Sequence, residues 1–198
     1  MADPSYIAAD GTLTDGDAWI GIGSTTVSGS STTSITFSST DDGQVGDYSQ
    51  YQDLVALTYI RFSSGGGVEG TFICEPNSDT YDGTNYPTQI FSGNGSAVLA
   101  AAWNGYMAVG YEVPGQTATA NAYAASIMNL FDINAGKFKT ALICNAADRS
   151  GAGRTGMVTS TWINQGPVTS LRFKGTGNQT FAAGSRIDLF GVLPRMVS

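Results

Sequence analysis

The residue types that carry most enzyme chemistry are scarce in this chain of 198 residues. It contains no histidine, which excludes a Ser-His-Asp triad, a Cys-His pair, a histidine-ligated zinc ion and a histidine pH switch. The two cysteines, Cys74 and Cys144, each close an apolar run (TFIC and ALIC), so we expect two buried free thiols. A disulfide between them would require that they lie close together in space, which the sequence does not decide.

One Gly-rich segment has the form of a phosphate-binding loop. Asp148–Gly156 (DRSGAGRTG) resembles the signature loop of protein tyrosine phosphatases, C-x-A-G-x-G-R-[ST]-G, in which backbone N–H groups and an arginine cradle a phosphate. Here Asp148 stands where the nucleophilic cysteine belongs, and Cys144 lies too far upstream of Arg154 to replace it. Without a thiolate to attack phosphorus the segment predicts no such enzyme, and we expect residues 145–156 to be a Gly-rich surface loop.

Carboxylates offer no clearer site. A glycosidase needs two facing carboxyl groups, and the sequence marks no such pair. The acidic clusters also lack the ligand order of a calcium loop, so we expect solvated turn residues and neither a metal nor a cofactor. The chain has three glutamates, Glu69, Glu75 and Glu112. The acidic clusters are Asp15/Asp17, Asp41/Asp42/Asp47 and Asn77/Asp79/Asp82.

Sugar binding is more compatible with the composition, because aromatic rings stack on sugars while Asn and Asp bind hydroxyl groups. The candidate contacts for a glycan or a protein partner are Tyr81, Asn85 and Tyr86, in the loop 75–87. Trp103 and Tyr106 offer similar chemistry, but aromatic residues within alternating strands pack into a core by default.

The elements that must position these residues are strands. Gly, Ser and Thr fill 68 of the 198 positions and only 13% of residues are charged, which argues against a helical bundle, while 41% hydrophobic residues suffice for a core. Alternating apolar and polar residues predict ten to twelve short strands in one all-β domain. The expected ranges are 19–27, 33–39, 54–62, 68–74, 88–92, 97–102, 105–112, 120–133, 138–144, 157–164, 168–174 and 185–193.

Two of these segments are unusual. Residues 54–62 (LVALTYIRF) are apolar on both faces, as expected of a strand that is sandwiched or packed at a subunit interface. Residues 120–133 permit a helix, but we favour a strand because Asn134-Ala135-Gly136 then forms a hairpin turn into 138–144.

Charge is segregated along the chain, which carries −7 in total. Residues 1–60 carry −8 and residues 137–198 carry +6, so early strands could pair with late ones, or one copy's acidic end could meet another copy's basic end. An acidic chain without a Lys/Arg cluster predicts no nucleic-acid partner. The start lacks the features of a signal peptide and the longest apolar run, Ala97–Trp103, is too short to span a bilayer, so we expect a cytosolic protein without a membrane partner.

The ordered set of segments resembles a β-rich virion protein family of tailed bacteriophages. Ser34–Thr40 (SITFSST), Tyr51–Ser64 (YQDLVALTYIRFSS) and Val168–Phe173 (VTSLRF) carry part of the resemblance. The strongest part is Gly184–Val192 (GSRIDLFGV), which fits a closing strand of the form G-S-x-[IF]-x-L-[YF]-G-[IV]. The resemblance covers residues 31–193 and implies a single jelly-roll-like antiparallel β sandwich, with residues 1–30 as an N-terminal arm and first strand and 31–198 as the sandwich domain.

The resemblance implies a non-enzymatic structural protein of the virion, assembled in the host cytoplasm. A capsid decoration (cement) protein is the first expectation, with the phage major capsid protein or neighbouring virion proteins as partners, a homotrimer as the oligomer, and residues 1–30 as the attachment segment. The alternative is the head of a fibre or tail tip that binds a host glycan through loops 75–87 and 145–156.

Overall fold

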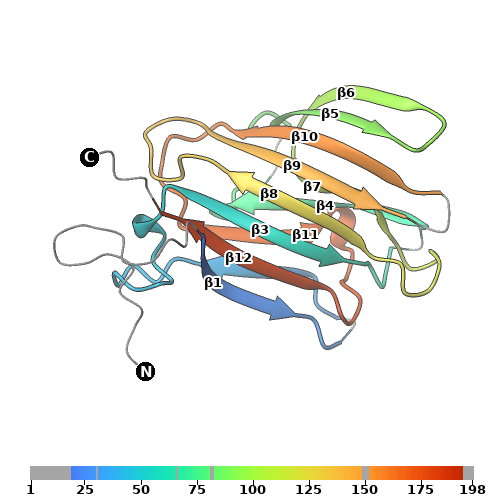
Figure 1. The fold of residues 1–198 in the computed structure, drawn as a ribbon, viewed down its shortest axis with the longest axis horizontal. Coiled ribbons are helices and arrows are strands. Elements are labelled where there is room, and N and C mark those ends of the chain that lie inside the picture. The colour runs from blue at the N-terminus through green and yellow to red at the C-terminus, as the bar shows by residue number, and fades with distance from the viewer. Residues whose placement is uncertain (1–18, 30, 66, 81–82, 149–151, 194–198) are drawn as a thin grey trace.

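The chain folds as an all-β sandwich. A computed structural model describes residues 19–29, 31–65, 67–80, 83–148 and 152–193, and in these residues two antiparallel sheets of eight and four strands pack face to face (Figure 1). The expected fold class is therefore confirmed. The strands are β1 Trp19–Thr26, β2 Ser34–Ser38, β3 Asp53–Ile60, β4 Glu69–Pro76, β5 Pro87–Gly93, β6 Val98–Asn104, β7 Met107–Pro114, β8 Ala124–Leu130, β9 Lys139–Ala147, β10 Arg154–Trp162, β11 Ser170–Gly175 and β12 Arg186–Val192, with short 3-10 helices at Tyr48–Gln50 and Thr176–Asn178.

The strand order within the sheets is that of a jelly roll. In that fold the first, eighth, third and sixth strands form one sheet, and the second, seventh, fourth and fifth form the other. Counting β2 to β8 and then β11 in this way gives the observed small sheet, β2-β11-β4-β7, and the order β3-β8-β5-β6 within the large one. The β9–β10 hairpin is inserted between β8 and β5, while β12 and β1 extend the large sheet beyond β3.

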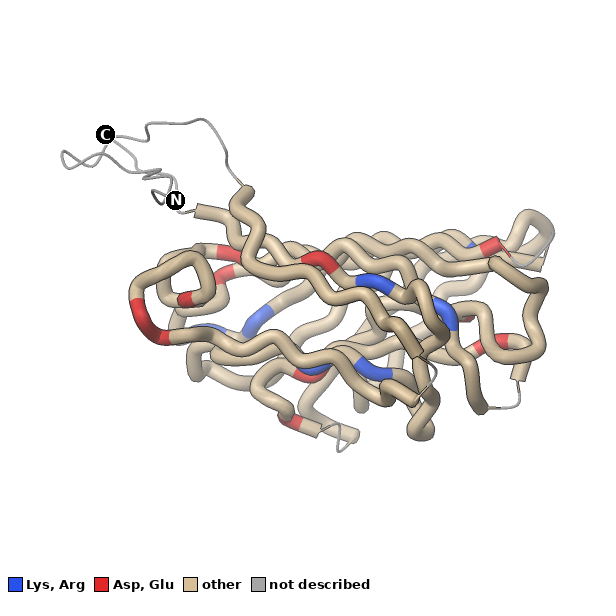
Figure 2. The backbone as a smooth tube through the Cα atoms, turned by 90° about the horizontal axis from the view of Figure 1, so that it is seen from below, with Lys and Arg blue, Asp and Glu red and all other residues tan. Residues whose placement is uncertain are grey.

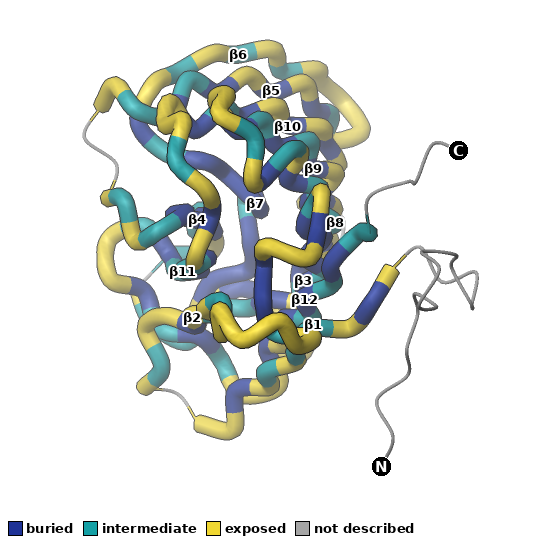
Figure 3. The backbone as a smooth tube through the Cα atoms, turned by 90° about the vertical axis from the view of Figure 1, so that its left-hand side faces the viewer, coloured by how far each residue is buried: buried dark blue, intermediate teal, exposed yellow. Residues whose placement is uncertain are grey.

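Period-two alternation decides which residues enter the core. In β9 the burial pattern alternates without a break from Lys139 to Ala147, and β10 and β12 alternate in the same way (Figure 3). The core includes a cluster of aromatic rings on the small sheet, in which Phe72 of β4 stacks on Phe173 of β11 at 5.8 Å and meets Phe181 edge-on at 5.9 Å. Such pairs add to the stability that burial of the rings already provides.

Two sequence expectations about local structure have different outcomes. The ambiguous segment 120–133 contains strand β8 and no helix, so the strand interpretation is confirmed. The expected loop at 145–156 is wrong at both ends, because β9 continues to Ala147 and β10 begins at Arg154. Arg154 pairs with Ala147 in the β9–β10 ladder, so the strands of this hairpin are longer than the glycines of residues 145–156 suggested.

The closing motif GSRIDLFGV has a structural explanation. Gly184 has φ +87°, a conformation that favours glycine, and so allows the chain to turn into β12. The buried Ser185 hydroxyl accepts from the backbone N–H of Arg61 and donates to its carbonyl oxygen. Gly191 has no side chain, which leaves room for the ring of Tyr51 packed against it. The pattern thus fixes the start and the packing of β12.

Strand pairing joins the two ends of the chain without pairing their charges, because β1 and β2 contain no charged residue. β1 pairs with β12 and β2 with β11, which brings the first and last parts of the chain together. Several ion pairs of the basic last third reach acids of the middle third instead: Arg172 and Lys174 both contact the buried Glu75, at 2.5 and 3.2 Å. Most of the described residues are uncharged and are drawn tan in Figure 2.

Replacing Glu75 with Gln should destabilise the fold. The substitution leaves Arg172 and Lys174 close together without the anion that joins them. We expect a loss of about 2–3 kcal/mol in the free energy of unfolding, less than the roughly 3–5 kcal/mol of a fully buried pair, since their side chains are 27% and 24% exposed. Urea denaturation measures it.

The matched control is Lys137→Gln, which breaks an exposed ion pair with Asp132 at 3.9 Å. Its effect should stay below about 0.5 kcal/mol. Equal losses in the two variants would show that Glu75 has no special structural role.

Candidate functional site

Arg154 of the phosphatase-like segment is engaged in a structural contact. Its Nε lies 2.6 Å from a carboxylate oxygen of Glu112 on β7, its guanidinium lies over the Tyr111 ring, and Nη1 donates to Ser92 on β5. Glu112 has φ +58° at an irregularity in the β4–β7 ladder, which turns its side chain toward β10. This arginine therefore ties the two sheets together, and its charge is already neutralised.

Two of the described glutamates are held in ion pairs. Glu75 and Glu112 each have arginine partners, so two of the three glutamates take part in ion pairs. Among the described residues no group of three acidic or cysteine side chains could hold a metal ion. Asp41, Asp42 and Asp47 lie in a turn. Asp47 accepts hydrogen bonds from the side chain and the N–H of Ser49 and from the N–H of Gly43, and these hold its pKa below the usual value.

Of the expected glycan contacts, the structure describes Asn85 and Tyr86, and neither is a fully exposed side chain. Tyr86 is wholly buried, and its hydroxyl donates to the backbone oxygen of Asp79 at 2.7 Å; burial raises the pKa of this phenol. The expectation that Tyr86 offers an exposed ring is therefore wrong, because the loop 75–87 folds its aromatic residue inward. Asn85 is half-buried and donates to Asp79, while Tyr81 lies outside the described residues. Trp162 also donates to Asp79, so this aspartate organises the loop from within.

The most unusual surface is the outer face of the large sheet. Strand registers align outward side chains into rows that cross neighbouring strands. Between β8 and β6, no outward strand residue of this face is charged. The central row reads Leu57, Ile127, Cys144, Met157, Phe91 and Ala100 from β3 to β6.

This row is exposed although it is apolar. Phe91 is 62% and Met157 50% exposed, and Tyr59 in the adjacent row is 46% exposed. At about 4.8 Å per strand, the row extends for roughly 24 Å. Contiguous apolar surface of this kind on a protein marks a site of interaction with another molecule.

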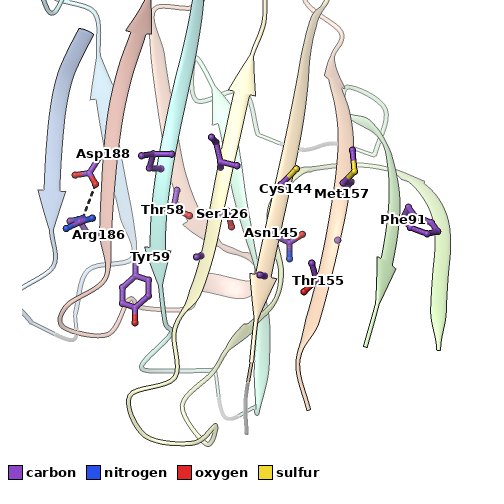
Figure 4. Close-up of a pocket in the computed structure, with 15 residues that line it drawn as sticks. Thr58, Tyr59, Phe91, Ser126, Cys144, Asn145, Thr155, Met157, Arg186 and Asp188 are labelled. Carbon is purple, nitrogen blue, oxygen red and sulfur yellow. Dashed lines mark ion pairs between the residues drawn. The ribbon is translucent and has the colours of Figure 1, made fainter. Parts of the chain in front are cut away.

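A hollow of about 680 Å³ lies on this face. It is bordered at one side by Arg186 and Asp188 of β12, which pair with each other at 2.9 Å, and at the other by Phe91 (Figure 4). Tyr59 on β3, Cys144 on β9 and Met157 on β10 lie between them, with β8 between the first two. The surface thus has an ion pair at its β12 side and an uncharged floor, which suits an apolar partner surface better than a charged ligand.

The sequence pointed to this surface only in part. The two-faced apolar pattern of 54–62 allowed a subunit interface, and β3 does expose Leu57 and Tyr59 on its outer side. The expectation that Cys144 is buried is wrong, because it lies on the outward parity of β9 and is exposed, whereas Cys74 is buried. Both thiols are free.

Comparison with protein-family models, with curated proteins and with solved structures found no match to this chain. Within the described parts of the chain there is no helix with the length and hydropathy needed to cross a membrane.

The two thiols should differ sharply in reactivity. A small water-soluble disulfide reagent should modify one thiol per chain, Cys144, in the native protein and both after denaturation. Burial raises the pKa of Cys74 and shields it from the reagent. Mass spectrometry of peptides assigns the modified residue, and Cys144→Ser should leave no reactive thiol in the native state. Modification of Cys74 in the folded chain would contradict the described burial.

Proposed function

We propose that this chain is a non-enzymatic structural protein of a tailed-phage virion, and specifically a capsid decoration protein that binds the coat through the outer face of its large sheet. The observation that carries the proposal is the exposed apolar row from Leu57 to Ala100 on a jelly-roll sandwich. A surface of this kind supports packing against another protein. The partner is the phage major capsid protein or a neighbouring virion protein, in a particle assembled in the host cytoplasm.

The physical basis of such binding is burial of apolar area without opposing charge. Each Å² of apolar surface removed from water contributes about 25 cal/mol. Because the floor of the hollow between Tyr59 and Phe91 carries no charged side chain, docking an apolar partner there leaves few polar groups without hydrogen bonds. Many copies on one particle would multiply a modest contact into a large effect on the lattice.

The fibre-head alternative has less support. Of the two rings that loop 75–87 could offer to a sugar, that of Tyr86 is buried. Asn85 is half-buried and donates to Asp79 and Thr80. We therefore retain decoration as the proposed function, and binding to host glycans without affinity for capsids would favour the fibre instead.

Met157→Lys should weaken capsid attachment at least tenfold. A lysine at the centre of the row would have to be buried without a partner, and the loss of one factor of ten corresponds to about 1.4 kcal/mol. Cosedimentation with empty capsids measures the affinity, and the capsid melting temperature reports the stabilisation. Ser38→Lys, at an exposed position on the small sheet, is the matched control and should bind normally. Equal binding by both variants would contradict attachment through the large sheet.

The proposed N-terminal arm can be tested separately. Residues 1–18 lie outside the described structure, whereas Ile20 and Val27 are buried in the core and β1 pairs with β12. Deletion should therefore end at residue 18, because removal of residues 1–30 would take away a strand. We expect the shortened chain to unfold at the same urea concentration as the full chain but to lose capsid attachment. If the shortened chain still attaches to capsids, the arm has no role in binding.

A further inference from the structure

The four free edges of the two sheets differ in their protection. Edge strands expose unpaired backbone groups, and proteins guard them with bulges, proline, charge or short length. β1 has a register shift between Gly21 and Gly23, β7 has two irregularities and ends in Pro114, and β2 is only five residues long. β6 forms the outermost strand of the large sheet beside β5 (Figure 1) and has none of these features.

The hydrogen bonds on either side of the β5–β6 ladder show which backbone groups of β6 do not bond to β5. The N–H of Gly105 donates to the carbonyl oxygen of Tyr86, and the N–H of Asn94 donates to that of Ala97, on either side of the β5–β6 ladder. Hydrogen-bonded pairs alternate along an antiparallel ladder, so the odd-numbered residues of β6 bond to β5. The N–H and C=O groups of Val98, Ala100, Ala102 and Asn104 therefore point away from β5, toward solvent.

We propose that β6 pairs antiparallel with β6 of a second copy of this chain, related by a two-fold axis at Ala101. This pairing makes a dimer, in place of the homotrimer that the resemblance implies. In this register the whole strand is used: Val98 lies opposite Asn104 of the second copy, and Ala100 opposite Ala102. These are the residues with free groups, and up to about eight backbone hydrogen bonds join the two strands, two for each hydrogen-bonded pair.

The side chains of β6 suit this pairing. The sequence VLAAAWN contains no charge, so no like charges meet across the axis. Ala101 meets its own copy in a non-hydrogen-bonded pair, where side chains approach most closely, and alanine is small enough to fit there. Leu99 lies opposite Trp103 of the second copy on the inner side, where both are already partly buried against the core. Val98, 69% exposed in the single chain, gains a neighbour.

The pairing has a consequence for the outer face. A two-fold axis through β6 places both outer faces on the same side of one continuous sheet. From strand spacing and residue rise, the six strands from β3 to β6 present roughly 500 Å² in one copy, less than the roughly 800 Å² per partner of a standard interface. Two adjoining faces together exceed that size. The inference stands without the proposed function, since the edge of β6 exists whatever the outer face binds.

The test begins with the unmodified full chain. Sedimentation velocity should show a dimer that dissociates on dilution. The amides of Ala100 and Ala102 should exchange hydrogen at least tenfold more slowly at high concentration than at low, because they are protected only in the pair. A monomer at all accessible concentrations, a trimer, or a dimer whose β6 amides stay unprotected would overturn the inference.

The variant test uses Ala100→Pro. This change removes a free N–H without touching the β5 ladder, and proline is tolerated on edge strands. The variant should be monomeric with unchanged near-ultraviolet circular dichroism. The control, Ala146→Lys on the outer face of β9, should weaken capsid binding and remain dimeric, so failure of the edge pairing and failure of the proposed function are separable. A dimer in Ala100→Pro would overturn the pairing; if that variant misfolds, hydrogen exchange in the unmodified chain decides.

Discussion

The structure depends on burying one face of each sheet against the other. Because side chains alternate across a strand, each strand commits every second residue to this interface and turns the remainder outward. The four strands of the small sheet contribute Phe72 and Phe173, and the large sheet contributes Trp162, Leu189 and the inner residues of β8 and β9. The outward residues of the strands form the exposed surfaces of the molecule, and polar side chains hold the segments that connect the strands.

Buried and half-buried polar side chains hold the turns and connecting segments, whose structure the alternating strand pattern does not determine. The ammonium group of Lys139 is enclosed and donates to the backbone oxygens of Ala135, Lys137 and Gln165, which fixes the β8–β9 turn. The Arg61 guanidinium donates to four backbone oxygens between Gln116 and Ala122 and so holds the segment that leads into β8. The buried Lys139 and the half-buried Arg61 keep their charges because these hydrogen bonds replace bonds to water.

The outer face of the large sheet combines rigidity with low charge. Apart from the edge strands β1 and β6, the strands that carry its side chains pair with a neighbour on both sides. A partner therefore meets a preformed surface, and little conformational entropy is lost on binding. The inserted β9–β10 hairpin matters here, since it widens the face and supplies Cys144 and Met157 at the centre of the apolar row. A jelly roll without this hairpin would bring β8 directly against β5 and present a narrower face.

The sequence alone determined the strands and, through period-two alternation, which residues of each strand share a face. That pattern is local, and it was sufficient for the all-β fold, for β8 as a strand and for the absence of the phosphatase nucleophile. Only the tertiary structure decided which face is the core. Cys144 and Ile143 are adjacent apolar residues, and the packing of β9 against β7 buries Ile143 and exposes Cys144. The pairing of Arg154 with Glu112 and the hydrogen bond from Trp162 to Asp79 join residues far apart in the chain, and no local pattern encodes such contacts.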